Sequence, residues 1–310
     1  MATLIVNPKQ LYGYEQLQKD LAKLETTYQG LLSTQIIGKS VDHRNIYAVK
    51  LGNGKSEIFL NGAHHAREWL TTSLLMNMID VYCKAYVEEE SIGEFDVRNI
   101  LDNTTIWFVP MVNPDGVELV QKGHENAKNP EFLLELNDGQ RDFSSWKANI
   151  RGVDLNRQYP ADWGNIADDV GQPAPMMFKG NSPLSEPETK AVYEFTLAHD
   201  FKLAVAYHSS GEELFWKYNA TGQLLKTARK LADKIVEKTG YDLVFPGDNP
   251  SGGGYTDWFI DSLKRPAFTP EISPLVGPRP VPLSNYDKIW QDNKEIGLLL
   301  AAEIGKKYVT

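Results

Sequence analysis

Residues 56–70 read SEIFLNGAHHAREWL, and this stretch indicates the fold class. Its first half is a short β-branched run that predicts a strand. From Trp69 the pattern WLTTSLLMNMIDVYCKAY repeats apolar residues at helical spacing, from Leu74 to Cys83, which predicts a packed helix. Two histidines, an arginine and a glutamate separate the strand from the helix. This polar cluster therefore lies between two elements of a predicted core.

The rest of the chain alternates between helical and strand patterns. Helical patterns cover 12–32, 185–199, 220–240 and 288–308, and strand patterns cover 33–41, 45–52, 56–63, 104–112, 201–208 and 266–272. The first three strand patterns predict a small β-meander. TTIWFVPMV (104–112) and FKLAVAYH (201–208) are almost continuously apolar, as in strands covered on both faces. We expect one α/β domain over residues 1–310, with a mixed, twisted central sheet and helices on both faces.

Turn and cap signals lie between these elements. NPDG at 113–116 predicts a turn after a strand. Residues 121–165 are rich in Gly, Asn, Asp and Trp, and only 129–136 has a helical pattern; long irregular segments of this kind are usually functional. Ser185 and Glu188 have the spacing of a capping box, so we interpret the acidic SEPE cluster as a helix start.

Composition limits the classes of function. The net charge of −9 disfavours nucleic acid and anionic membranes as partners, and no run of about 18 apolar residues occurs. The opening MATLIVNPKQLYGYEQL shows no secretion signal, so we expect a cytoplasmic protein. The single cysteine, Cys83, is predicted to be buried. One cysteine excludes an internal disulfide or a cysteine zinc cluster, and it leaves histidine and carboxylate as metal ligands.

The polar cluster offers two possible metal-binding pairs. His65 and Glu68 are three positions apart and His64 and Glu68 are four apart, and either pair can face one side of a helical turn. His208 follows a buried strand directly, at the position where α/β sheets build their sites. Two imidazole nitrogens and one carboxylate, with a fourth position open to water, are typical of hydrolytic zinc.

A zinc hydrolase of this type also needs a base that does not bind the metal. Glu271 ends the strand pattern PAFTPEI and could accept the proton of the attacking water; the alternative is a buried ion pair. The remaining histidines lack a partner pattern. His43 and His124 are expected to face solvent, and His199 to end a helix.

Three glycines precede the helical segment near residue 255. Gly252, Gly253 and Gly254 resemble a phosphate loop, but the Lys-Ser/Thr that such a loop needs is missing. We interpret these glycines as flexible backbone at the rim of a pocket.

Seven stretches occur in a fixed order over almost the whole chain: IGKSVDHRNIYAVKL, NGAHHAREW, VPMVNPDGVE, GVDLNRQYP, AYHSSGEELFW, SGGGYTDW and FTPEIS. With these stretches the chain resembles the zinc carboxypeptidases related to pancreatic carboxypeptidase A. The resemblance implies a metallopeptidase that uses one zinc ion.

The resemblance also implies individual roles. The family's metal ligands fall on His65, Glu68 and His208, and the general base falls on Glu271. His64 is then expected either to support the ligands or to pack beside them. The family residues that bind the terminal carboxylate and other parts of the substrate fall on Asn156, Arg157 and Arg67. An arginine fork suits a carboxylate because it binds both oxygens.

Two positions depart from the family pattern. The stretch SWKAN has Lys147, with Arg151 nearby, where the family has an oxyanion-stabilising arginine. Digestive members carry a mobile tyrosine three positions before S-G-G, where this chain has Asp248. We expect Tyr255 to take over part of that role or to line the pocket.

These departures point to a subgroup of the family. WKANIRGVDLNRQYP, HSSGEELFW and GGGYTDWFI look like bacterial γ-D-glutamyl-L-diamino acid endopeptidases, which cut peptidoglycan stem peptides before diaminopimelate or lysine. The resemblance therefore implies a muropeptide substrate. Diaminopimelate carries an extra ammonium and carboxylate, for which Arg157 and a nearby acid such as Asp257 or Glu213 are chemically suitable partners. The alternatives are a carboxypeptidase for ordinary peptides and a non-catalytic peptide-binding module.

Overall fold

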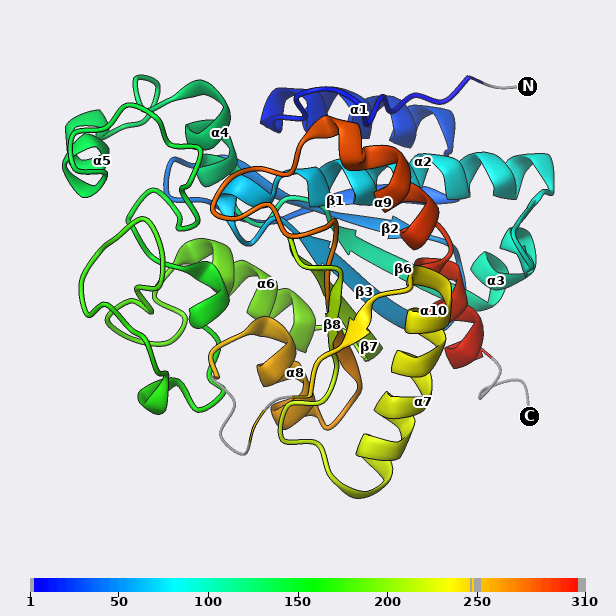
Figure 1. The fold of residues 1–310 in the computed structure, drawn as a ribbon. Coiled ribbons are helices and arrows are strands. Elements are labelled where there is room, and N and C mark those ends of the chain that lie inside the picture. Colours follow the sequence, from blue (N-terminus) through cyan, green and yellow to red (C-terminus); the bar gives the residue numbers. More distant parts are fainter. Residues whose placement is uncertain (1–2, 246, 248–251, 306–310) are drawn as a thin grey trace.

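The computed structural model describes residues 3–245, 247 and 252–305 (Figure 1). Asp248, at which the family's mobile tyrosine is replaced, lies outside the described residues. Within these ranges, no helix combines the length and the apolar character that a membrane span requires.

The centre of the molecule is an eight-stranded sheet with the order β1-β2-β6-β3-β7-β10-β8-β9. Its strands are β1 (Leu32–Lys39), β2 (Asn45–Leu51), β3 (Ser56–Gly62), β6 (Thr104–Val109), β7 (Phe201–Tyr207), β8 (Glu213–Phe215), β9 (Asp242–Leu243) and β10 (Ala267–Glu271); β4 (Ser91–Ile92) and β5 (Phe95–Asp96) form a separate hairpin. The inner strands β6, β3, β7 and β10 run parallel, while β1, β2 and β8 are antiparallel to their inner neighbours. The sheet is therefore mixed, as predicted.

Helices cover both faces of the sheet (Figure 1). They are α1 (Tyr14–Thr27), α2 (Leu70–Glu88), α3 (Val97–Asn103), α4 (Pro114–Lys122), α5 (Pro130–Leu136), α6 (Pro187–Leu197), α7 (Gly222–Thr239), α8 (Tyr255–Leu263), α9 (Tyr286–Asn293) and α10 (Ile296–Gly305), with 3-10 turns η1 (Ala66–Glu68), η2 (Leu155–Arg157), η3 (Trp163–Asn165) and η4 (Leu283–Asn285). The core on one face includes α1, α2, α7 and α10, and the core on the other face includes α6 and α8.

Alternation along the inner strands explains why both faces are covered. In β3, Ile58 and Leu60 point into the core around α2, while Phe59 points into the core around α6 and α8. All three side chains are fully buried. The predicted helix that contains Cys83 is α2, and its cysteine is buried as expected. The predicted α/β fold class is confirmed.

Two predicted connections are wrong. The meander is interrupted because β6 inserts between β2 and β3, so β3 pairs in parallel with β6 and β7. An apolar strand such as β3 is more stable at the centre of a sheet, where both of its faces are buried. The C-terminal helical pattern forms two helices, α9 and α10, instead of one.

Two predicted cap signals also act differently. The NPDG segment starts α4 instead of ending in a turn: the Asn113 side chain accepts a hydrogen bond from Gly116 N at 3.0 Å, and Pro114 occupies the first turn. The SEPE segment starts α6 at Pro187, but its N-cap is Glu186 and no capping box forms at Ser185. Glu186 and Glu188 are buried and both lie within hydrogen-bond distance of Asn149, so these acids have a structural role.

The irregular segment between α4 and α6 has its own small core. Trp146 is fully buried against Phe143, at 5.5 Å between ring centroids, and its indole nitrogen donates to Asn149 O at 3.2 Å. His124 packs near Phe143 and is only 4% exposed, so the predicted solvent position is wrong for this histidine. His43, by contrast, is exposed.

Replacing Trp146 by alanine should destabilise this segment. Because Trp146 is fully buried, we expect Trp146→Ala to lower the free energy of unfolding by about 3–5 kcal/mol. Leu197→Ala is the matched control, because Leu197 is 51% exposed and its loss should cost less than about 1 kcal/mol. Urea denaturation of both variants measures the difference; equal stabilities would contradict this packing.

Candidate zinc site and active site

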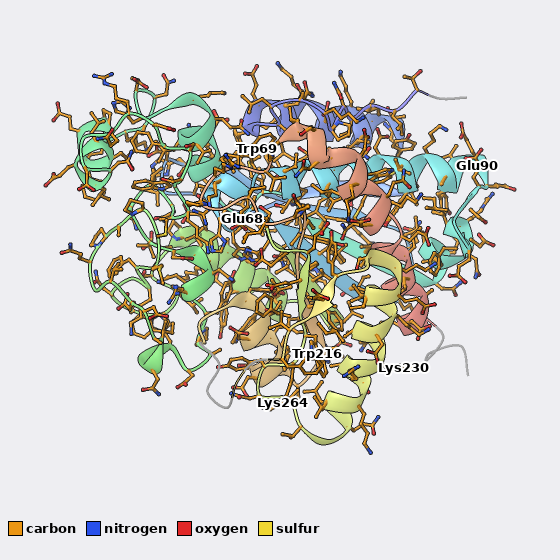
Figure 2. All side chains as sticks on the ribbon, in the orientation of Figure 1. Glu68, Trp69, Glu90, Trp216, Lys230 and Lys264 are labelled. Carbon is orange, nitrogen blue, oxygen red and sulfur yellow. The ribbon has the colours of Figure 1, made fainter. Side chains whose placement is uncertain are left out.

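The predicted metal ligands meet where the parallel strands end. His65 precedes η1 in extended conformation, Glu68 ends this single 3-10 turn, and His208 directly follows β7. All three are buried, with exposed fractions of 4%, 3% and 1%. The short turn after β3 brings His65 and Glu68 to the same side, opposite His208. Figure 2 labels Glu68 at this position.

The three side chains form a compact donor set. His65 Nδ1 lies 2.9 Å from Glu68 Oε1, His208 Nδ1 lies 2.9 Å from Glu68 Oε2, and the two Nδ1 atoms are 3.0 Å apart. Tetrahedral zinc with bonds of about 2.0–2.1 Å places its ligand atoms roughly 3.3 Å apart, so only small shifts are needed. Among the described residues, these three are also the group of histidines and acids whose donor atoms can share one ion. The site therefore fits zinc.

Asp154 supports the site from the far side of His65. Its Oδ1 lies 3.0 Å from His65 Nε2, so the ring can donate there and direct Nδ1 towards the metal position. Burial alone would raise the pKa of Asp154, but the charges of His65, Lys147 and Arg157 outweigh it and hold the pKa well below its ordinary value. Sequence reasoning missed Asp154, although it stands in the quoted stretch GVDLNRQYP.

His64 points away from the donor set. Its Nε2 lies 2.9 Å from the hydroxyl of Tyr159, and its ring is fully buried. Burial, together with the neighbouring His208 and His65, lowers the pKa of His64 well below its ordinary value, so the ring is neutral. Of the two pairs that the spacing allowed, the structure assembles His65 with Glu68.

Glu271 ends β10 beside His208. The backbone joins them, because His208 N donates to Pro270 O and Ile272 N donates to His208 O, both at 2.9 Å. Burial and the charge of Glu68 raise the pKa of Glu271 to about 8, against the opposing charges of Lys147 and Arg67. Glu271 has no ion-pair partner among the described residues. A structural ion pair is therefore not its role here.

Lys147, predicted to stabilise the oxyanion, and Arg67, predicted to contact the substrate, both lie near Glu271. Lys147 is close enough for its charge to act on Glu271, Asp154 and His208. Arg67 also acts on Glu271, and its guanidinium donates to Ser145 O at 2.9 Å. The segment around Lys147 is held by the backbone of η1, since Ala66 N donates to Lys147 O at 3.0 Å.

The prediction that Arg151 helps to stabilise the oxyanion is wrong. The side chain of Arg151 is 53% exposed and lies 3.6 Å from Glu186 Oε2. Arg151 makes an ion pair next to the start of α6, so it does not belong to the oxyanion-stabilising residues.

Asn156 and Arg157 lie on η2, next to the pocket. Asn156 lines the pocket, and its Oδ1 accepts a hydrogen bond from Tyr255 N at 3.0 Å. Arg157 Nη1 donates to Ala167 O at 2.9 Å, and its Nε lies 3.8 Å from Asp154 Oδ2. The structure thus couples Arg157 to the same carboxylate that supports His65.

Tyr255 does not line the pocket. Its side chain is fully buried, and its hydroxyl lies 3.2 Å from that of Thr196 on α6. The first turn of α8 directs this ring into the core around Phe59. The expectation that Tyr255 would replace the family's mobile tyrosine is wrong, and only its backbone N–H contributes, through Asn156.

The glycines before α8 have a packing role. A Cβ at Gly252 would lie 2.2 Å from Ala161 O, and Gly253 exchanges backbone hydrogen bonds with Ala161 and Tyr159. These residues hold the backbone close to the segment after η2, so the prediction of a flexible rim is wrong for Gly252 and Gly253.

A pocket of about 300 Å³ opens beside Glu271. Its lining includes Asn156, Lys217, Thr256, Asp257 and Thr269. Burial raises the pKa of Asp257 to about 7, although its Oδ2 accepts a hydrogen bond from Gly254 N at 3.1 Å. Of the two acids considered for a substrate ammonium, Asp257 lines this pocket, whereas Glu213 is exposed on β8.

A family model described as zinc carboxypeptidase matches residues 17–295. The chain belongs to the zinc carboxypeptidase family. It is therefore a zinc metallopeptidase, and the predicted zinc cofactor is confirmed by this membership together with the His-Glu-His group.

One relative is similar to this chain in sequence, and two solved structures are similar to it in fold. The chain is 35% identical over 301 residues to γ-D-glutamyl-L-diamino acid endopeptidase 1 of Lysinibacillus sphaericus, which covers 96% of this chain and 73% of that protein. The fold is similar to that of carboxypeptidase A from Helicoverpa armigera, with a TM-score of 0.73 at 17% identity over 97% of this chain and 75% of the other. Thrombin-activatable fibrinolysis inhibitor has a TM-score of 0.76 at 19% identity, over 96% and 75% of the two chains.

Substitution of single histidines should separate the metal ligand from its neighbour. We expect His65→Ala to weaken zinc binding by more than the roughly 10–100-fold that the loss of an outer partner costs, because one of three ligands is removed. His64→Ala and the exposed control His43→Ala should both retain about one zinc per chain. Calorimetric titration with zinc measures all three; loss of zinc from His64→Ala but not from His65→Ala would contradict the assignment.

Proposed function

We propose that this zinc metallopeptidase cleaves the amide bond between γ-D-glutamate and a diamino acid, diaminopimelate or lysine, in peptidoglycan stem peptides. The observation that carries the proposal is the pocket beside Glu271, which presents both a carboxylate and an ammonium group. The endopeptidase relative from Lysinibacillus sphaericus, similar over 96% of this chain, supports the same choice.

The pocket matches the side chain of a diamino acid. Asp257 is partly buried, and a buried carboxylate with a pKa raised to about 7 gains when a cation binds next to it. The hydroxyls of Thr256 and Thr269 lie 2.8 Å apart on the pocket wall and offer further hydrogen bonds. Lys217 supplies a positive charge for the second carboxylate of diaminopimelate. An ordinary apolar C-terminal side chain would leave Asp257 unpaired.

Hydrolysis of the amide bond requires both a metal ion and a proton-transferring residue. Zinc held by His65, Glu68 and His208 would polarise the scissile carbonyl and lower the pKa of a bound water to about 7. Glu271 accepts the proton of the attacking water and then delivers it to the leaving amine. A carboxylate at this position can hold the proton between the two steps.

The remaining side chains position the substrate. The charges of Lys147 and Arg67 both act on Glu271, and these two residues stabilise the negative charge that develops on the carbonyl oxygen. Asn156 and Arg157 bind a substrate carboxylate from the side of η2. A non-catalytic peptide-binding module is set aside, since the chain belongs to a family of zinc peptidases.

A comparison of three substrates tests this function. We expect the zinc-loaded protein to release diaminopimelate from L-alanyl-γ-D-glutamyl-diaminopimelate and lysine from the corresponding lysine tripeptide. An N-blocked dipeptide of ordinary residues should be cleaved at least about 100-fold more slowly, because it lacks the groups that pair with Asp257 and Lys217. Product release is followed by chromatography and mass spectrometry. Preferential cleavage of the blocked dipeptide would assign an ordinary carboxypeptidase instead.

Removing the pocket carboxylate should affect binding more than turnover. We expect Asp257→Asn to raise KM for both tripeptides about tenfold with little change in kcat, since about 1.4 kcal/mol of binding is lost. Glu237→Gln is the matched control, because Glu237 is exposed on α7 and lies outside the pocket lining.

The raised pKa of Asp257 predicts that KM depends on pH. Asp257 has a raised pKa of about 7, so it is neutral below this value and charged above it. KM of the wild-type protein should therefore rise as pH falls through about 7, and Asp257→Asn should lack this rise. A KM that is independent of pH in both proteins would show that Asp257 does not bind the ammonium.

A further inference from the structure

A second hollow adjoins the active-site pocket. We call it the basic groove and define it by Trp216, Lys217, Lys226, Arg229, Lys230 and Phe245. Its volume is about 610 Å³, and it shares Trp216 and Lys217 with the pocket. Trp216 and Lys217 therefore lie at the boundary between the pocket and the basic groove. Figure 2 labels Trp216 and, on α7, Lys230.

The groove is positively charged in a chain whose net charge is −9. Lys226, Arg229 and Lys230 lie on one face of α7, because residues three and four positions apart are neighbours on a helix. The carboxylate in the lining, Asp233, already pairs with Arg229 at 2.7 Å. Among the described residues, Lys217, Lys226 and Lys230 have no ion-pair partner. The surplus charge suits an anion.

Aromatic rings form one wall of the groove. Trp216 and Phe245 meet edge to face at 5.9 Å between centroids, and the Arg229 guanidinium lies 5.7 Å and 5.5 Å from these rings. Phe245 is nevertheless 61% exposed. An exposed ring in a groove that also contains unpaired lysines is typical of a binding surface, because the ring offers apolar contact to a ligand while the lysines pair with its charges.

We propose that the basic groove binds the part of the substrate beyond the diamino acid, a peptide extension that ends in a carboxylate. The inference rests on the proposed function, which places the diamino acid in the pocket. It follows from two features: the groove borders the pocket at Trp216 and Lys217, which line both hollows, and its lysines are complementary to carboxylates. The enzyme would therefore prefer leaving groups longer than a single diamino acid.

A charge-reversal variant tests the groove. The double variant Lys226→Glu, Lys230→Glu is compared with Lys23→Glu, Lys55→Glu, which makes the same charge change at exposed positions on α1 and before β3. Three substrates are used: the tripeptide that ends at the diamino acid, the same peptide extended by alanyl-alanine with a free carboxylate, and the extended peptide with a terminal amide.

The expected result is specific to the free carboxylate. KM of the groove variant for the extended acid should rise about tenfold, with kcat within about twofold, and 0.5 M salt should reduce the difference. KM for the other two substrates should stay within about twofold, and the control variant should match the wild type throughout. An unchanged KM for the extended acid, or an equal rise for all three substrates, would overturn the proposal. The proposal would also be overturned if pyrophosphate inhibited competitively while the extended acid and the extended amide had the same KM.

A direct binding measurement separates this proposal from the proposed function. Diamino acid–alanyl-alanine, the leaving-group peptide itself, is titrated calorimetrically into zinc-loaded Glu271→Gln, with and without the two groove substitutions. Binding that weakens about tenfold with the substitutions supports the groove. If the wild-type protein fails to cleave the tripeptides, that result counts against the proposed function alone. Equal binding by both proteins overturns the groove.

Discussion

The active site depends on one interaction, the placement of His65 between two buried carboxylates. Its Nδ1 faces Glu68 at 2.9 Å and its Nε2 faces Asp154 at 3.0 Å, and all three residues are at most 4% exposed. Buried carboxylates are costly without positive charge nearby. Zinc would supply that charge at the Nδ1 side, while Lys147 and Arg157 supply it around Asp154. The geometry of the remaining site follows from this arrangement.

The sheet makes this arrangement possible. The parallel strands β3, β7 and β10 lie next to one another and end at the same edge, which brings the turn with His65 and Glu68 together with His208 and Glu271. The charge of Glu68 raises the pKa of Glu271, but Glu271 is not one of the three residues that can bind the metal. One carboxylate is therefore available to bind metal and the other to carry a proton. The pocket opens beside Glu271, and the basic groove lies along α7.

Local patterns in the sequence predicted the parts of the site that depend on local structure. The strand ends at His208 and Glu271 are properties of single elements. The local spacing allowed either His64 or His65 as the partner of Glu68, and the family resemblance selected His65. Asp154 was not predicted as the partner of His65, and Arg151 was wrongly predicted to stabilise the oxyanion. Both residues lie in the irregular segment, whose path depends on the buried Trp146 and on contacts with η1. The position of Tyr255 depends on how α8 packs against β3, which no local pattern encodes. The basic groove likewise requires α7 to meet the segment after β8.

The central claim is that one zinc ion is held by two histidines and one glutamate where β3 and β7 end. X-ray absorption spectroscopy at the zinc edge tests it most directly, because imidazole rings give multiple-scattering signals that carboxylates lack. We predict four or five nitrogen and oxygen ligands at about 2.0–2.1 Å, of which two are imidazoles. A spectrum that requires three imidazoles, or only one, would contradict the assignment of His65, Glu68 and His208.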